Sequence, residues 1–181
     1  MRYIIFGIVL LVVIAGGYIA YTFITTKNHS PADTVIFQDR DFLLTIDYCR
    51  PYKKGRLIFG NDSEKPLLPY GKYWRTGANE ATEIDFNQDI QVAGKLLEAG
   101  RYRLYTYPGK EEWVVVFNSG LGKWGYSEPD DAMDVLRINV SSQEADTVCE
   151  QFLISIEPVG TDAMEVNLSW DNVLVPIAIS Y

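Results

Sequence analysis

Residues 101–118 decide the fold class of this chain. They read Arg-Tyr-Arg-Leu-Tyr-Thr-Tyr-Pro-Gly-Lys-Glu-Glu-Trp-Val-Val-Val-Phe-Asn. The first seven residues alternate, with Tyr102, Leu104 and Thr106 on one face of a predicted strand. Residues 108–111 have the composition of a turn, and the valine-rich run that follows favours a returning strand. The stretch therefore predicts a β-hairpin.

Similar strand-like runs recur from Thr34 onward, separated by Gly, Pro, Asn and Asp. Apolar residues alternate with other residues over 42–49 and 83–86. Further strands are predicted at Val135–Val140, Phe152–Glu157, Glu165–Trp170 and Val173–Ile179. Because no helical period separates these runs, the pattern predicts an all-β domain over residues 34–181, either an antiparallel β-sandwich or a jelly roll.

The amino terminus has a different character. Tyr3 to Ile24 is a run of 22 residues without a charge, long enough for one helix to cross a bilayer. We expect residues 1–26 to form an N-terminal transmembrane signal anchor and residues 27–33 a short tether. Residues 15–17 also fit the cleavage site of a signal peptide, but apolar residues continue past them, which favours the anchor.

The flanking charges predict the orientation of this anchor. Arg2 and the terminal amino group favour an amino terminus inside the cell. The sequence therefore predicts a single-pass membrane protein that contacts the membrane through residues 3–24. Its C-terminal domain is then periplasmic or at the cell surface.

The charge balance narrows the range of partners and chemistries. The chain has 181 residues, with 16 Lys and Arg against 24 Asp and Glu, a net charge of −8. Two of the basic residues, Arg2 and Lys27, precede the β domain, so residues 28–181 carry 14 basic and 24 acidic side chains and a net charge of −10. This balance argues against a nucleic-acid partner. With one histidine and two cysteines, we expect neither a metal site nor a cofactor.

Several motifs cluster before and around a polar segment, residues 68–82, that reads as a packed loop. They are Ser30-Pro31, Tyr48-Cys49-Arg50-Pro51, Lys54-Gly55-Arg56, Ile58-Phe59-Gly60, Pro69-Tyr70-Gly71, Trp74-Arg75-Thr76-Gly77-Ala78-Asn79-Glu80-Ala81-Thr82 and Ala99-Gly100-Arg101-Tyr102-Arg103-Leu104. This set resembles a bacterial family of extracytoplasmic proteins known only as a domain of unknown function, over most of residues 30–180. The resemblance implies an exported β-sandwich and no established activity. Cys49 departs from the family's usual serine.

The same motifs supply candidate ligand-binding residues. Four cations lie within residues 50–56 of an otherwise acidic domain, and Arg75 follows in the loop. Because arginine presents a planar fork that suits carboxylate or phosphate, the loops could form a site for an anionic small molecule or an acidic sugar. The candidates are Arg50, Lys54, Arg56, Trp74, Arg75, Asn79 and Glu80. Salt bridges from the arginines to Glu80, Glu83 or Asp85 are the competing interpretation.

We assign no catalytic residue, and three functional hypotheses stay open. The first is a ligand- or partner-binding module held outside the cytoplasm. The second is a hydrolase of cell-surface polymers that uses Glu80 with Arg75 or Arg50. The third is a structural envelope protein whose motif loops only hold the fold. Cys49 and Cys149 could pair as a disulfide in an oxidising compartment or remain free thiols.

Overall fold

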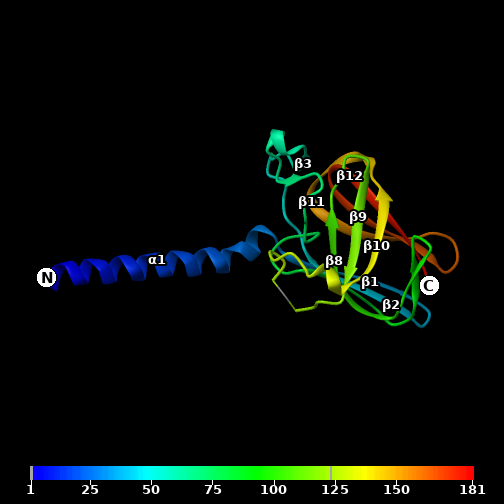
Figure 1. Ribbon diagram of the computed structural model, residues 1–181, viewed down its shortest axis with the longest axis horizontal. Helices are drawn as coiled ribbons and strands as arrows, with labels where there is room; N and C mark the ends of the chain where they lie inside the picture. The colour runs from blue at the N-terminus through cyan, green and yellow to red at the C-terminus, as the bar shows by residue number, and fades with distance from the viewer. Residues whose placement is uncertain (1, 123) are drawn as a thin grey trace.

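The chain forms one long helix followed by a β domain (Figure 1), and a computed structural model describes residues 2–122 and 124–181. The first sheet has six strands, every neighbouring pair antiparallel. In spatial order they are β1 (Ala32–Asp39), β2 (Phe42–Cys49), β5 (Thr82–Phe86), β8 (Gly100–Tyr107), β9 (Glu112–Asn118) and β10 (Asp134–Ser141).

The second sheet has four strands, again antiparallel. Their order is β11 (Gln143–Pro158), β12 (Ala163–Ser180), β6 (Ile90–Val92) and β7 (Lys95–Leu97). A short parallel pair, β3 (Phe59–Gly60) and β4 (Leu68–Pro69), lies apart from both sheets. Two 3₁₀ turns, η1 (Asp62–Glu64) and η2 (Asp131–Met133), complete the domain.

The predicted hairpin is confirmed. Strands β8 and β9 pair antiparallel, with Tyr107 opposite Val114, and the turn lies between them. A Cβ atom on Gly109 would lie 2.0 Å from the Glu112 carbonyl oxygen, so this tight turn requires glycine. The alternating residues Tyr102 and Leu104 face the core, as their period-2 spacing predicts.

Side chains from both sheets form a single buried cluster, the arrangement of an antiparallel β-sandwich. Its centre is aromatic. Trp74 contacts Trp113, Phe152, Phe59 and Trp170, with ring centroids 4.9–5.9 Å apart. The all-β prediction is therefore confirmed. The loop between β4 and β5, residues 70–81, carries the longest of the sequence motifs; this motif loop contributes Trp74 to the core.

The last two predicted strands, 165–170 and 173–179, both lie within β12 (Ala163–Ser180). The Tyr181 amide, just after β12, donates to the Asp162 carbonyl oxygen, just before it, at 3.0 Å, whereas a straight strand of this length would hold its ends about 50 Å or more apart. The chain therefore turns back on itself within β12, at Asp171, whose φ is 57°, and the pairing with β11 shifts register there. The predicted break between the two strands is confirmed.

Helix α1 (Arg2–His29) extends away from the β domain (Figure 1). The isoleucine, valine and leucine side chains at positions 8–14 are 54–68% exposed. No helix in the described part of the chain has an apolar stretch long enough to cross a membrane. The side chains of residues 3–6 and 22–24, at the two ends of the expected membrane segment, lie outside that part. The helix ends one residue before Ser30, and β1 begins at Ala32.

Candidate functional site

A pocket of about 330 Å³ opens beside the motif loop that joins β4 to β5. Four of the sequence-derived candidates line it: Arg56, Trp74, Arg75 and Asn79. The rest of its lining is Ser30, Pro51, Leu67, Leu68, Gly77, Ala78 and Trp170. None of these described residues is acidic, although the domain as a whole is strongly negative. Its size suits a small ligand.

The loop is held by backbone pairing with the first sheet. Trp74 exchanges two backbone hydrogen bonds with Thr106, at 2.8 and 2.9 Å. The Thr82 hydroxyl donates to the Thr76 carbonyl oxygen at 2.7 Å, which closes the loop on itself. A Cβ atom on Gly77 would lie 2.9 Å from the Cys49 carbonyl oxygen, so only glycine allows this approach. The unusual composition of residues 74–82 is thus a requirement of close packing.

Two residues of the loop have left-handed backbone. Thr76 has a φ of 55° and is fully buried, and Asn79 also has a φ of 55°. Asparagine tolerates this region, whereas a β-branched residue in it is strained by roughly 1–3 kcal/mol. Strain of this kind is found at ligand-binding and catalytic sites more often than elsewhere.

Arg75 is held against the loop without an acidic partner. Its Nη1 donates to the Asn79 carbonyl oxygen at 3.1 Å, and its guanidinium lies 5.8 Å from the centre of the Tyr126 ring. No carboxylate in the described chain comes within ion-pair distance of it. Burial lowers the pKa of this guanidinium below its ordinary value, so a bound anion would be favoured there.

Packing from a second loop fixes the position of Arg75. A Cβ atom on Gly125 would lie 2.7 Å from the Arg75 Cδ atom and 2.9 Å from the Glu80 carbonyl oxygen. The Gly125 amide also donates to the Asn79 carbonyl oxygen at 3.2 Å. The loop after β9 therefore presses directly on the motif loop.

Arg56 is the other cation of the pocket, and it is exposed. Its Nε donates to the Lys53 carbonyl oxygen at 2.9 Å, and its Nη2 donates to the Tyr52 carbonyl oxygen. As with Arg75, its partners are neutral backbone groups. The positive charge of both side chains stays uncompensated by any described carboxylate.

Arg50 lies outside the pocket lining and serves the fold. Its Nη1 pairs with the Asp33 carboxylate at 3.1 Å, and its Nε donates to the Phe152 carbonyl oxygen at 3.1 Å. The salt-bridge interpretation holds for Arg50, but with Asp33 in place of the three acids expected. Pairing of β1 with β2 puts Asp33 opposite Tyr48, a proximity that local sequence does not reveal.

Lys54 and Glu80 also lie apart from the pocket lining. The Lys54 Nζ atom is 3.2 Å from the His29 Nδ1 atom, at the end of α1. Glu80 accepts a hydrogen bond from the Cys49 thiol at 3.4 Å and lines two neighbouring pockets, of about 400 and 210 Å³, together with Asp47. Glu80 therefore does not share the pocket of its neighbour Asn79, whose backbone is left-handed.

Sequence reasoning missed Trp170. It lines the pocket, is 2% exposed, and its indole N–H has no hydrogen-bond partner in the described structure. A buried donor without a partner is costly in a folded protein. Nothing in its strand pattern separates it from an ordinary core residue.

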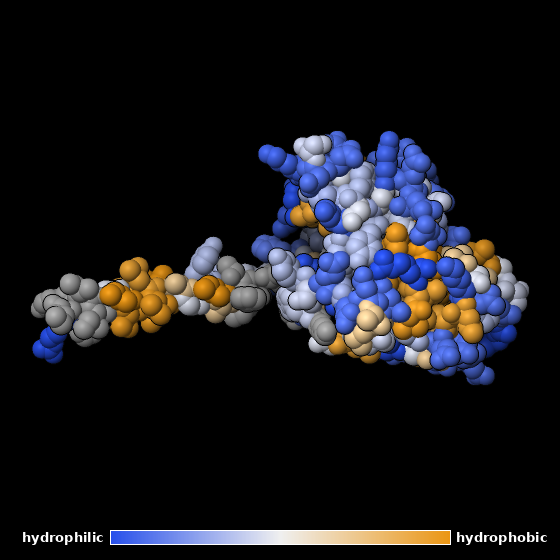
Figure 2. All heavy atoms as spheres, in the orientation of Figure 1, coloured by the Kyte–Doolittle hydropathy of each residue, from blue (hydrophilic) through white to orange (hydrophobic). Residues whose placement is uncertain are grey.

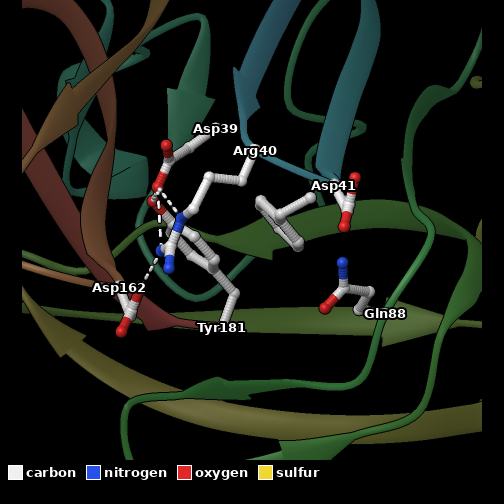
Figure 3. A pocket seen from close by; sticks show the side chains of 7 residues that line it. Asp39, Arg40, Asp41, Gln88, Asp162 and Tyr181 are labelled. Atoms are coloured by element: carbon white, nitrogen blue, oxygen red, sulfur yellow. Dashed lines mark hydrogen bonds and ion pairs between the residues drawn. The ribbon is translucent and has the colours of Figure 1, made fainter.

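Another pocket, of about 300 Å³, lies at the tip of the β1–β2 hairpin (Figure 3). Arg40 points across it to Asp39 and Asp162, and it forms ion pairs with both. The Tyr181 hydroxyl donates to the Asp39 carboxylate at 3.0 Å. These groups satisfy one another and fasten the hairpin to the end of β12, so we read this pocket as structural.

Both cysteines are free thiols. Cys49 contacts Glu80, and the Cys149 thiol donates to the Gln151 carbonyl oxygen at 3.1 Å. Burial raises the pKa of each thiol, which suppresses the reactive thiolate. The disulfide alternative is not what the structure contains.

Comparison with known proteins extends this description in one respect. No curated protein and no solved structure matches the chain. The sequence profile of one family, described as a protein of unknown function (DUF2911), matches residues 30–179, which include the whole β-sandwich core and the motif loop. The chain therefore belongs to the DUF2911 family.

Proposed function

We propose that this protein is a binding module for a small anion, held outside the cytoplasm by a membrane anchor at its amino terminus. The ligand site is the Arg56–Arg75 pocket described above. The ligand carries a carboxylate or phosphate group, as an acidic sugar does. The observation that carries this proposal is a pair of arginines, unpaired with any described carboxylate, on a pocket without acidic lining in a domain of net charge −10.

Three further features support binding over a purely structural role. The Trp170 indole N–H, buried without a partner, can donate to a ligand oxygen. The Trp74 and Trp170 rings stack with centroids 5.7 Å apart and offer an apolar floor. The left-handed backbone at Thr76 shows that the loop keeps a costly shape. A loop that only connected β4 to β5 would not need it.

The anchor rests on the sequence and on the exposure of α1. A helix that is apolar all round is stable when lipid or protein covers it. The side chains at positions 8–14 are 54–68% exposed in this structure, so protein does not cover them. Together with the 22 uncharged residues from Tyr3 to Ile24, this favours insertion into a bilayer.

Binding is tested on the detergent-solubilised full chain by thermal shift and calorimetry. The probes are inorganic phosphate, glucuronate and galacturonate. We expect at least one of them to raise the melting temperature, and Arg75→Gln and Arg56→Gln to abolish the shift. Lys95→Gln, which removes one charge from β7 at the edge of the second sheet, is the matched control. An identical shift in all three variants would refute the site.

The orientation is tested in spheroplasts, whose outer membrane has been removed. Added protease should digest the β domain while a cytoplasmic marker survives. The chain should also stay in the membrane pellet after alkaline carbonate extraction. A domain that stays protected until the membrane is permeabilised would overturn the predicted location.

A further inference from the structure

We infer that the anion held by the Arg56–Arg75 pocket is the phosphate group of an anionic membrane phospholipid, supplied by the bilayer in which α1 is anchored. This inference rests on the proposed function, because it takes both the anion site and the anchor as given. It adds the source of the ligand. It also adds a second membrane contact, made by the β domain itself.

The pocket is built onto the end of the helix. Ser30, which follows α1 directly, is part of its lining. The Asn79 side-chain amide donates to the Ser30 carbonyl oxygen at 3.2 Å, so the motif loop is bonded to the helix end. Lys54 contacts His29 at the same place. The position of the pocket relative to the anchor is therefore set by direct contacts.

The spacing along the chain matches the thickness of the headgroup layer. Ser30 lies six positions after Ile24, the last residue of the predicted membrane segment, which is about 9 Å along a helix axis. The polar headgroup region adds roughly 5–8 Å to each side of the hydrocarbon core. The wall of the pocket thus begins at the outer edge of the phospholipid headgroups.

Exposed leucines stand beside the pocket. Leu67, one of its lining residues, is 42% exposed, and Leu57 is 47% exposed. The Leu67 amide donates to the Leu57 carbonyl oxygen at 2.9 Å, so the two lie next to each other. Figure 1 shows β3, which lies between them in the chain, on the side of the β domain where α1 enters. Leucine next to arginine is the pairing expected where a protein meets a lipid interface.

Acidic residues occur in the same segment, on the turn η1 between the two leucines. The Glu64 carboxylate accepts a hydrogen bond from the Asn61 backbone N–H at 2.7 Å, so this carboxylate caps the start of η1. Neither Asp62 nor Glu64 is part of the pocket lining. The described lining that meets the headgroup therefore carries positive charge only.

A membrane source also explains how a small, open pocket can fill. Anchoring converts binding into an intramolecular event, because the headgroups surround the pocket at high local concentration. Weak attraction from two arginines and one indole N–H is then enough for occupancy. A free anion would have to be bound at its much lower solution concentration.

The test uses the full chain in nanodiscs of phosphatidylcholine, with and without phosphatidylglycerol, and native mass spectrometry to count retained lipids. We expect the wild-type protein to retain phosphatidylglycerol with a preference of about tenfold over phosphatidylcholine, and Arg56→Gln with Arg75→Gln to remove that preference. Lys95→Gln should keep it. Circular dichroism and the melting temperature show whether each variant is folded. Arg56→Gln alone changes an exposed side chain and provides a variant at low risk of misfolding.

A second arm separates the ligand sources. Inorganic phosphate and glycerol phosphate are titrated into the nanodisc sample without phosphatidylglycerol. The inference is overturned, and the anion site survives, if these bind and phosphatidylglycerol shows no arginine-dependent preference. If no phosphate, uronate or lipid binds in an arginine-dependent way, both the inference and the proposed function fail. Arginine-dependent retention of phosphatidylglycerol is by itself enough to support both the inference and the proposed function.

Discussion

Asn79 is the residue that joins the motif loop to the end of α1. Its side chain is 5% exposed, its φ is 55°, and its amide donates to the Ser30 carbonyl oxygen. Asparagine meets both needs, because it tolerates left-handed backbone and carries a donor. The sequence alone shows that Asn79 carries an amide group that can donate a hydrogen bond. Its backbone conformation and its partner, 49 residues away in the chain, are properties of the folded state.

Two substitutions separate these roles. Asn79→Gly keeps access to the left-handed region and loses the hydrogen bond, which should lower the free energy of unfolding by about 1 kcal/mol. Asn79→Ala loses both features and should cost about 2 kcal/mol or more. Urea unfolding followed by tryptophan fluorescence measures both values. Equal losses for the two variants would show that the left-handed backbone carries no cost.

Tyr105 provides a test at high pH. Its side chain is fully buried, and its hydroxyl donates to the Asp134 carboxylate at 2.8 Å. Burial, and then this hydrogen bond, raise the pKa of Tyr105 well above its ordinary value. The unfolded chain releases this proton near pH 10, whereas the folded chain keeps it. The stability is therefore complete below pH 10 and falls above it, by about 1.4 kcal/mol per pH unit for this one proton.

Tyr105→Phe removes this proton from the balance. The variant loses a hydrogen bond and should be less stable at neutral pH by about 1 kcal/mol. Its free energy of unfolding should then decline less steeply above pH 10 than that of the wild-type protein. Urea unfolding at a series of alkaline pH values measures both slopes. Two identical slopes would mean that folded Tyr105 titrates like the unfolded residue.

At the scale of elements, local pairing decides what the sequence can reveal. The β8–β9 hairpin was predictable because its turn and both its strands lie within residues 101–118. The two arms of β12 were predictable as well, because Asp171 and Asn172 separate two strand-like runs and have the composition of a turn. The pocket combines residues that the sequence can indicate with residues that only the folded chain brings together. Its arginines stand out in an acidic chain, whereas Trp170 on β12 and Leu67 before β4 reach it through tertiary packing.

The turn within β12 is joined to the basic segment, residues 50–56, by an ion pair. The Lys53 Nζ atom lies 2.5 Å from the Asp171 carboxylate, and the two side chains are only 22% and 13% exposed. Removing one partner of such a pair costs more than at an exposed pair, because the other charge is left in a place that water reaches poorly. It holds the segment that carries Arg56 against the second sheet.

We expect Lys53→Gln and Asp171→Asn each to lower the free energy of unfolding by about 1–3 kcal/mol. The double variant should be less destabilised than the sum, since neither partner is then left charged and alone. Arg40→Gln with Asp162→Asn gives a comparison cycle for an exposed pair, whose side chains are 64% and 45% exposed, and its coupling energy should be smaller. Coupling of similar size in both cycles would contradict the role given to burial.

At the scale of the whole molecule, charge and hydropathy are sorted along the long axis. Figure 2 shows clusters of apolar residues on the visible part of α1, while the β domain has a largely polar surface with some apolar patches. Residues 28–181 carry a net charge of −10, yet the described pocket lining next to the helix end contains cations and no acids. A strongly negative domain would be repelled by anionic lipids. The proposed anchor would therefore turn the cationic pocket toward the membrane and keep the negative remainder of the domain away from it.

This arrangement predicts that the distance between anchor and pocket controls lipid binding. Insertion of seven alanines after Thr26 adds about two helical turns, or about 10 Å, and keeps the helical phase nearly unchanged. The pocket then lies beyond the headgroup layer. We expect the nanodisc preference for phosphatidylglycerol to fall to that of the Arg56→Gln, Arg75→Gln variant, because the headgroups no longer reach the arginines. The affinity for glycerol phosphate should stay at the wild-type value, because no residue of the pocket has changed. An inserted chain that retains phosphatidylglycerol as well as the wild-type protein would show that the pocket does not depend on its own membrane for its ligand.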